Sequence, residues 1–525
     1  MPLKVSFACG GFELLKRKTG IFGKAFLFAF FFLISITFSR ASTLENIPLN
    51  SWVYQAVDEL YAQGFFPRLH KNVRPYQRGE IASYLTETDE RIRDKKLNPS
   101  PHQLWLLDKL KDEFMWEMEA LGREPKANIV KYGINPFFYL TQNRIDTSWT
   151  RGTLEIDGAF QLKDRLILKD KIIIDTRAEK DPNLYAREWE NDLSGIMDQG
   201  YLKLYFKPIS IFFGRDYLRW GPGQKDFLLL SGFAPPFDML KLDAGTGWFR
   251  FLFFATSLDE KTISDTLHKR YLSGHRINIK PKPYLELGAS EVVLYGGAGR
   301  SWELYYLNPI LLYYGEEFNQ KGDDNPLWSF DFSFTGIRDV ELYGELLIDD
   351  FQYDFKTEPH QIGFKLGANY ANFFGLEGGL LNLEYQRINN WVYGQNRAWN
   401  LYTYHDIGMG SSLGPDADQI SLFSHYHLSH DFQMSFSLSY KRKGEGKIGV
   451  QPPRVPKHEK FPSGVVEYTK SAQLLLLYQP DANFHLLGKM GFNRVDNSLN
   501  RQDRDEDNLY FQVRLKYSFW QEWWL

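Results

Sequence analysis

From about residue 135 to the C-terminus, apolar and polar residues alternate with a period of two over segments of roughly ten residues. The clearest examples are WSFDFSF at 328–334, MSFSLSY at 434–440 and FQVRLKYSF at 511–519. A period of two predicts β-strands with one apolar and one polar face. Strands of soluble sandwiches are shorter, usually about 5–6 residues. Segments of this length are typical of strands that cross a bilayer with the apolar face toward lipid.

The connections between these segments alternate between short and long. Short ones lie at 207–208, 280–283, 336–339, 429–431 and 479–481, and long polar ones at 178–197, 219–235, 296–326, 391–416, 444–464 and 495–507. Outer-membrane barrels combine tight periplasmic turns with long external loops. We therefore predict a transmembrane β-barrel of about 18 antiparallel strands over residues 127–525. The pattern is weakest at 197–258, and the link near 146–149 is short for an external loop.

Composition agrees with a barrel better than with a soluble enzyme. Aromatic residues make up 16% of the chain and glycine occurs 42 times, yet the mean hydropathy is polar. A lipid-facing apolar surface, a polar lumen and aromatic girdles produce this combination. The one cysteine, Cys9, lies near the N-terminus. If an N-terminal segment that contains Cys9 is removed on export, the remaining chain has no cysteine and forms no disulfide bond.

The first 41 residues are predicted to be a secretory signal peptide. Basic residues at 16–18 precede an apolar run at 21–38, and Ser39-Arg40-Ala41 places small residues where a signal peptidase cleaves. A membrane anchor of similar length is the alternative. Without residues 1–41 the chain has 56 basic and 64 acidic residues, a formal charge of −8. That charge disfavours nucleic acid as a partner.

Residues 42–126 are predicted to form a periplasmic helical bundle. Apolar residues recur at helical spacing over 53–61, and a second helix is expected at 78–93. A third is expected at 100–122, from the capping box SPHQ to a terminal glycine. No chemistry is visible in this part. A faint likeness of 48–90 to an S-layer homology module, which would bind cell-wall polymer, is the alternative.

One glycine- and proline-rich stretch, GRDYLRWGPGQKDFLLLSGFAPP at 214–236, falls on an external loop. No Gly-Lys-Ser/Thr follows it, so it is not a phosphate-binding loop. One interpretation is a turn, shaped by Gly221-Pro222-Gly223, that folds the loop into the lumen as a plug. The other adds polysaccharide contacts from Arg215, Arg219 and Trp220, because sugars stack on indole rings and Arg binds carboxylates.

Together with other segments, this stretch resembles the signature of the capsule assembly protein Wzi family. The supporting segments are NIPLNSWVYQAVDELYAQGFFP, RPYQRGEIA, YLNPI, DDNPLWSFDFSF and ELYGELLIDDF. The resemblance implies an outer-membrane barrel with a helical N-terminal part and a surface lectin that holds capsular polysaccharide. Asp323 and Asp324, which begin DDNPLW, join the candidate polysaccharide contacts. The C-terminal WQEWWL departs from barrels that end on a terminal aromatic, which leaves the register of the final strand open.

Two motifs suggest catalysis and are better explained by structure. GSSLG at 410–414 matches the nucleophile-elbow pattern, but it lies in a loop without the strand and helix that the elbow needs, so Ser412 is not expected to be catalytic. Glu345 and Asp349 share a strand face. They are expected to be lumen carboxylates rather than a glycosidase pair. We therefore expect no catalytic residue.

Two further motifs suggest metal binding. HYHLSH at 425–430 offers three histidines, but zinc needs further ligands held in place, and lumen histidines are the preferred interpretation. DRDED at 503–507 lacks the glycine and the terminal acid of a calcium loop. We expect no metal site and no cofactor.

The sequence thus favours a binding protein: an outer-membrane surface lectin that binds capsular or extracellular polysaccharide and helps to assemble or retain it. The alternative is a substrate-selective or plugged porin for polyanionic or sugar substrates. An outer-membrane hydrolase is disfavoured because no catalytic constellation is complete. The expected partners are the polysaccharide, outer-membrane lipid and the barrel assembly machinery. The chain is expected to be a monomer.

Overall fold

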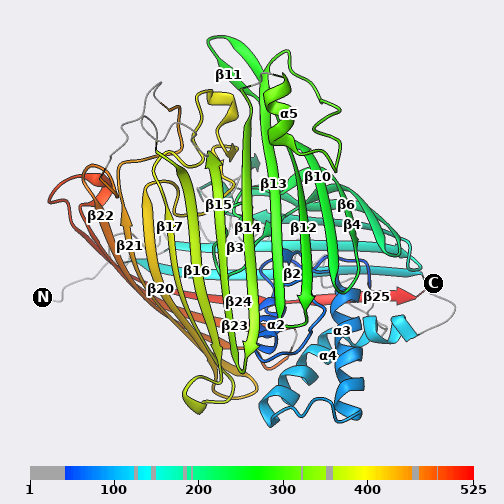
Figure 1. The fold of residues 1–525 in the computed structure, drawn as a ribbon. Helices are drawn as coiled ribbons and strands as arrows, with labels where there is room; N and C mark the ends of the chain where they lie inside the picture. Colours follow the sequence, from blue (N-terminus) through cyan, green and yellow to red (C-terminus); the bar gives the residue numbers. More distant parts are fainter. Residues whose placement is uncertain are drawn as a thin grey trace, which may run out of the picture. The chain divides into compact units, whose positions relative to one another are not determined.

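The computed structural model describes residues 42–122, 128–143, 149–180, 186–190, 193–320, 323–350, 359–451, 460–481 and 483–524. Within these ranges the chain forms a closed barrel of 18 antiparallel strand positions (Figure 1). The predicted fold class and strand number are therefore confirmed. The predicted signal peptide and most of the short link at 146–149 lie outside the described residues.

The strands follow one another around the barrel in chain order, and the last pairs with the first. They are β2 (Ile129–Asn143), β3 (Trp149–Leu162), β4 (Leu166–Asp175), β6 (Leu193–Phe206), β7 (Ile209–Asp216), β9 (Phe237–Gly245), β10 (Phe249–Ser257), β12 (Thr266–Lys282), β13 (Leu285–Ala298), β14 (Asn325–Ile337), β15 (Val340–Asp350), β16 (Gln361–Ala371), β17 (Gly379–Ile388), β20 (Ala417–His427), β21 (Phe432–Lys443), β22 (Glu467–Tyr478), β23 (Phe484–Asp496) and β24 (Glu506–Tyr517). The segment β25 (Phe519–Trp524) pairs with β2 directly beyond β24, so the C-terminal residues lengthen the final strand position.

Short elements lie in the connections. They are β1 (Val73–Arg74), β5 (Arg187–Glu190), β8 (Arg219–Trp220), β11 (Lys261–Ile263), β18 (Thr403–Tyr404), β19 (Ile407–Gly408), α5 (Tyr313–Gln320) and the 3-10 turns η1 (Ala178–Lys180), η2 (Phe373–Gly375), η3 (Ala398–Asn400) and η4 (Ser498–Asn500). We call the end of the barrel with the long connections the loop end. The opposite end, with the tight turns, is the helix end (Figure 1).

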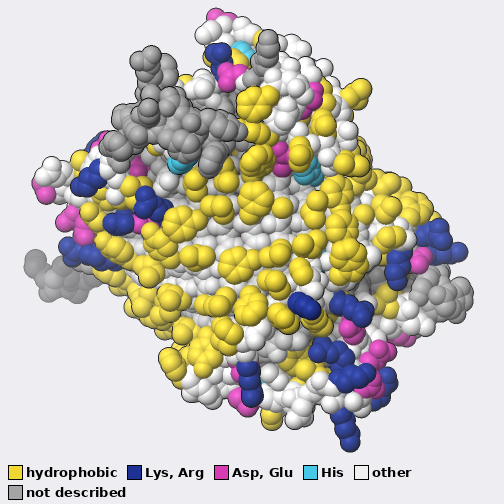
Figure 2. All heavy atoms as spheres, viewed as in Figure 1, with side chains coloured by type: hydrophobic (Ala, Val, Ile, Leu, Met, Phe, Trp, Pro, Cys, Tyr) yellow, Lys and Arg dark blue, Asp and Glu magenta, His cyan; other side chains and the backbone are white. Residues whose placement is uncertain are grey.

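The period-two pattern places apolar side chains outside the barrel and polar ones inside. In β24, Leu515 is 41% exposed on the outer wall, whereas Lys516 points inward with its Nζ 4.7 Å from the Phe137 ring centroid. Figure 2 shows hydrophobic side chains across the strand-covered middle of the molecule, with most charged side chains toward the two ends. This belt is the surface that a bilayer covers.

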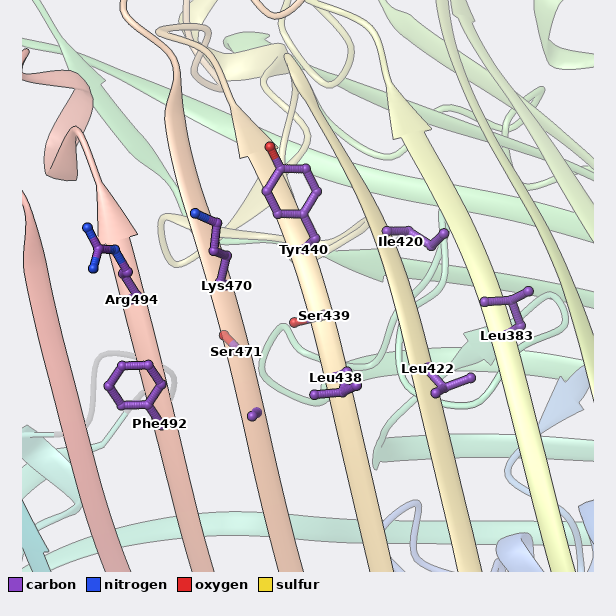
Figure 3. A pocket seen from close by; sticks show the side chains of 11 residues that line it. Leu383, Ile420, Leu422, Leu438, Ser439, Tyr440, Lys470, Ser471, Phe492 and Arg494 are labelled. Atoms are coloured by element: carbon purple, nitrogen blue, oxygen red, sulfur yellow. The ribbon is translucent and has the colours of Figure 1, made fainter.

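A groove on the outer wall crosses strands β17 and β20–β23 (Figure 3). Leu383, Ile420 and Leu438 line it and are 40–50% exposed on the outer face. Tyr440 and Lys470 lie toward its loop end. The groove therefore belongs to the lipid-facing surface rather than to the lumen.

The three predicted helices are confirmed as α2 (Val53–Ala62), α3 (Arg78–Arg93) and α4 (Pro101–Gly122). The capping box closes as expected: Ser100 N donates to Gln103 Oε1 at 2.8 Å, and Gln103 N donates to Ser100 Oγ at 3.4 Å. Among the described helices, none is both long and apolar enough to cross a membrane. An apolar cluster that includes Val57, Leu60 and Leu107 holds the helices together.

The sequence did not indicate that the first part of this helical region enters the barrel. Residues 42–77, which we call the N-terminal segment, contact the inward faces of strands on more than one side of the barrel. Glu45 accepts hydrogen bonds from Lys131 of β2 at 2.8 Å and from Lys169 of β4 at 2.6 Å. On the other side, Asn72 Nδ2 donates to Asp331 of β14 at 2.8 Å. The segment therefore fills the lumen toward the helix end, and α3 and α4 follow it.

Two long connections fold to opposite sides of the barrel wall. The connection between β13 and β14 folds over the outside of the wall, where Tyr306 and Tyr313 bury the outward-facing Tyr271 and Tyr295. The α5 helix lies in this flap (Figure 1). The connection after β7 folds inward instead and meets the N-terminal segment.

Candidate functional site

Residues 217–236, which we call the inserted loop, fold into the lumen and pair with the N-terminal segment there. β8 and β1 form a two-stranded antiparallel sheet with Trp220 opposite Val73 and Arg219 opposite Arg74. Gly221 N donates to Asn72 O at 2.9 Å. The plug interpretation of the loop is therefore correct in its geometry. Two segments separated by about 140 positions therefore pair with each other inside the barrel.

The glycines of the inserted loop have backbone angles that other residues resist. Gly221 has φ +107° and Gly223 has φ +118°. A Cβ on Gly221 would lie 2.9 Å from the Glu345 carboxylate, and one on Gly223 would lie 2.9 Å from Lys365 Nζ. Glycine is therefore required here both for the turn and for its close approach to the barrel wall.

Lys365 of β16 fastens the turn from the wall. Its Nζ donates to Pro222 O at 2.6 Å and to Asp226 O at 2.7 Å, and it lies 3.2 Å from Glu345 Oε2. Glu345 in turn accepts from Leu228 N at 3.2 Å. Because this ion pair is fully buried and hydrogen-bonded to the loop backbone, it specifies the position of the loop.

Trp220, which was expected to stack against a sugar, is buried instead. Its indole is 1% exposed and packs edge-on against Phe254, with the ring centroids 5.4 Å apart. No ring face is open to a sugar. Arg219 donates from Nε to Ser231 O at 3.0 Å and lies over the Phe227 ring, so it also holds the loop together.

Arg215 lies on the outer wall rather than at the lumen mouth. It shares the outward face of β7 with Phe213, which is 68% exposed. Its Nε donates to Asp238 Oδ1 of β9 at 2.8 Å. Arg215 therefore lies outside the lumen, because the register of β7 directs its side chain outward; its predicted contact with polysaccharide stays a prediction.

The two aspartates of DDNPLW hold loops in place. Asp324 is buried and accepts from Arg300 at 3.1 Å and from Tyr306 Oη at 2.9 Å, which fastens the outer flap. Asp323 is half-exposed and accepts from Arg397 at 2.7 Å, which joins the flap to the connection at 389–416. Asp323 is the member of the predicted set that stays accessible at the loop end.

Asp349 and Ser412 also fasten the plug. Asp349 accepts from the backbone N of Tyr393, and the Tyr393 hydroxyl donates to Leu228 O at 2.6 Å. Ser412 Oγ donates to Asp226 Oδ2 at 3.0 Å. Through these contacts the 389–416 connection is the third segment inside the barrel. Because the carboxylates and the serine are occupied in this way, the structure groups none of them into a catalytic pair.

The inward face of β23 and β24 carries cations that the plug does not neutralise. We call Lys489, Arg514 and Lys516 of these strands, with Lys225 of the inserted loop, the basic face. Among the described residues no carboxylate lies within salt-bridge distance of any of the four. Arg514 Nε is buried without a hydrogen-bond partner. Other inward-facing lysines differ, since Lys365 of β16 and Lys169 of β4 are paired with carboxylates.

Aromatic rings interleave with the basic face. Lys489 lies over Tyr510, Arg514 over Tyr139 and Lys516 over Phe137, at 4.7–5.8 Å from the ring centroids. All six side chains are half-buried. Cations and aromatic rings side by side on one polar wall suit a ligand that has both carboxylates and apolar sugar faces.

Lys225 shows that solvent reaches this part of the lumen. It is enclosed by the barrel, with its Nζ 4.5 Å from the inward-facing Phe423 ring, yet its side chain is exposed. Desolvation by its surroundings and the positive charge of Lys489 lower the pKa of Lys225. An anion placed between Lys225 and Lys489 would remove that repulsion.

A family model described as capsule assembly protein Wzi matches residues 139–509. The chain belongs to this family. Escherichia coli Wzi, an outer-membrane protein described as a carbohydrate-binding β-barrel involved in group 1 capsule assembly, aligns with a TM-score of 0.61 and 17% identity over 90% of this chain and 100% of that one. The likeness to Escherichia coli Wzi is one of fold, and the family places this barrel in the outer membrane.

Other solved structures are less similar. Pseudomonas aeruginosa OccD3 aligns with a TM-score of 0.45 and 7% identity, covering 74% of this chain and 91% of that one. Acinetobacter baumannii OccAB4 aligns with a TM-score of 0.45 and 9% identity, covering 76% and 99%. A comparison with curated protein sequences found no match.

Sequence reasoning missed the basic face of this Wzi-family barrel, although the signal was present. The alternation places Arg514 and Lys516 on the polar face of the last strand. Lys489 lies on the same face of the preceding strand. The sequence could not show that these cations have no carboxylate partner among the residues that the structure describes.

Proposed function

We propose that this protein is an outer-membrane lectin that binds an acidic capsular or extracellular polysaccharide, and that the basic face is the surface that contacts it. The observation that carries the proposal is a set of four cations that have no carboxylate partner in the described part of the chain and that interleave with aromatic rings. An unpaired buried cation is costly unless a ligand or solvent compensates it. A uronic-acid polymer supplies both the anion and the apolar ring face.

Membership of the Wzi family supports a capsule polymer as the ligand class, because the Escherichia coli relative is described as carbohydrate-binding. The proposal takes the protein to be a monomer that the barrel assembly machinery inserts among outer-membrane lipids. It assigns binding rather than catalysis, since Glu345 and Asp349 are engaged in holding the plug.

The test is binding of a soluble uronic-acid polysaccharide to the purified protein in detergent. We expect Lys489→Gln and Arg514→Gln each to weaken binding about tenfold, since a hydrogen bond to a charged group contributes about 1.5–3 kcal/mol. Binding to the wild type should also weaken as salt is raised. The matched control is Lys470→Gln, because Lys470 lies on the outer wall and is paired with Asp496 at 3.1 Å.

Two results would contradict this assignment. One is equal affinity of Lys489→Gln, Arg514→Gln and the wild type for the acidic polymer. The other is equal affinity of the wild type for the acidic polymer and for neutral dextran. In either case the charge of the basic face does not determine binding.

The second candidate function is a plugged porin that passes small anions, and the solvent-exposed Lys225 inside the barrel favours it. Anion-selective current through the wild type in a planar bilayer, reduced in Lys489→Gln, would support transport. Retention of polymer without such current supports the lectin.

A further inference from the structure

Four side chains from three separate elements converge at the helix end of the barrel. Glu59 lies on α2, His102 begins α4, and His425 and His427 lie on the inward face of β20. Glu59 Oε1 lies 2.8 Å from His102 Nε2, and Glu59 Oε2 lies 3.0 Å from His425 Nε2. His427 Nε2 lies 3.7 Å from Glu59 Oε2, which is too long for a hydrogen bond.

We propose that Glu59, His102 and His427 bind a divalent transition-metal ion of the zinc type, which clamps the periplasmic helices to the barrel. One ligand atom from each of the three lies within 4.8 Å of the other two. In a tetrahedral zinc site, bonds of about 2.0–2.1 Å place ligand atoms about 3.4 Å apart. The Glu59 carboxylate lies between the two rings, with Oε1 2.8 Å from His102 Nε2 and Oε2 3.7 Å from His427 Nε2.

The donor set has the right chemistry for this ion. Imidazole nitrogen and carboxylate oxygen are common zinc ligands, and three protein ligands leave one position for water. Such side chains bind a metal ion as an ionised carboxylate and neutral imidazoles.

His425 positions the carboxylate from its other oxygen. Its ring is fully buried, its Nε2 lies 3.0 Å from Glu59 Oε2, and its Nδ1 has no hydrogen-bond partner among the described residues. Ligating carboxylates are held by such outer hydrogen bonds. Without an ion, three histidines face one carboxylate, and His427 has no hydrogen bond to it.

Space for the cluster is also built into the fold. Gly378, in the turn between β16 and β17, has φ +82°, and a Cβ there would lie 2.7 Å from the His102 ring. His102 and His427 are each 12% exposed, which gives an ion a route from the periplasmic side. The sequence analysis expected no metal site, because Glu59 and His102 lie more than 300 positions from the HYHLSH motif.

The test is Co²⁺ binding by the full chain, without an affinity tag, after chelator treatment in detergent. We expect one equivalent of Co²⁺ to give visible absorption typical of tetrahedral coordination, and Zn²⁺ to displace it. His102→Gln and His427→Gln should lose the signal. His430→Gln is the matched control, because His430 stacks on Trp105 beside the cluster without belonging to the donor set.

A second measurement uses only the wild type, so it does not depend on the variants folding. Zn²⁺ should raise the temperature at which the helical circular dichroism signal is lost, and chelator should reverse this. The proposal is overturned if the wild type binds no Co²⁺, if His102→Gln and His427→Gln bind it as the wild type does, or if Zn²⁺ leaves the melting temperature unchanged. Any of these results identifies the cluster as a hydrogen-bonded contact only.

Discussion

Among single residues, Gly221 must be glycine for two reasons, its backbone conformation and its close packing. Its φ of +107° and the Glu345 carboxylate beside it both exclude a side chain. A residue forced into such backbone angles costs about 1–3 kcal/mol, to which the steric clash adds. We therefore expect Gly221→Val to displace the inserted loop and raise bilayer conductance, while heat-modifiable gel migration shows an intact barrel.

The control for that variant is Gly488→Val. Gly488 lies on β23, and a Cβ there would meet nothing within 4 Å. Unchanged conductance is expected. If both variants conduct equally, the loop does not depend on the conformation of Gly221.

The register of the last strand gives a second prediction for single residues. Leu515 faces lipid and Lys516 faces the lumen. Arginine at a lipid-facing position near the bilayer midplane costs about 2–4 kcal/mol, and less near an interface. Leu515→Arg should therefore lower the free energy of unfolding in lipid vesicles more than Lys516→Leu does. The reverse order would place the register one residue away.

At the scale of elements, the plug depends on buried charges that hold its segments to strands. Lys365 bonds two loop carbonyls and pairs with Glu345, so Lys365→Gln leaves a buried carboxylate without its cation. Breaking such a pair costs about 3–5 kcal/mol. We expect faster tryptic cleavage after Lys225 in this variant. Lys269→Gln, on the exposed outer face of β12, should leave the cleavage rate unchanged.

The N-terminal segment gives a pH-dependent prediction. Burial would raise the pKa of Glu45, but Lys131, Lys169 and Arg78 hold it far below the ordinary 4.5. A depressed pKa means that the stabilisation is present above the unfolded-state value and is lost as pH falls below about 4.5. The wild type should therefore melt at a lower temperature at pH 3 than at pH 7.

Glu45→Gln isolates that contribution. At pH 7 this variant should melt at a lower temperature than the wild type. Its melting temperature should then fall less than that of the wild type on acidification. Glu179→Gln is the control, because the partner of Glu179 among the described residues is its exposed neighbour Lys180. Identical pH profiles for the wild type and Glu45→Gln would show that other carboxylates govern the acid sensitivity.

For the whole molecule, we expect replacement of two long connections to have different effects on permeability. Replacing residues 218–235 with a short Gly-Ser link should raise conductance, because this loop lies in the lumen and pairs with the N-terminal segment. Replacing 301–318 should not, because that connection covers outward-facing tyrosines on the wall. Planar-bilayer recordings of both variants test this difference. Equal conductance changes would mean that the inserted loop does not limit flow.

The barrel, its strand number, the three helices and the family could all be predicted from the amino-acid sequence. These follow from local rules: period-two alternation, turn lengths, the capping box at 100–103 and short signatures. The contents of the lumen could not be predicted, because they depend on the folded arrangement of the chain. Trp220 is enclosed because β8 pairs with β1, and Arg215 faces outward because of the register of β7. Both depend on contacts between distant segments, which no local pattern encodes.

For the same reason, neither of the two proposed sites could be predicted from the sequence. Alternation placed Arg514 and Lys516 in the lumen, but which charges face them there depends on the packing of distant segments. The Glu59 cluster needs α2, α4 and β20 to meet at one end of the barrel. Side-chain type is a local property, whereas the partner of a charge is set by the packing of the whole chain.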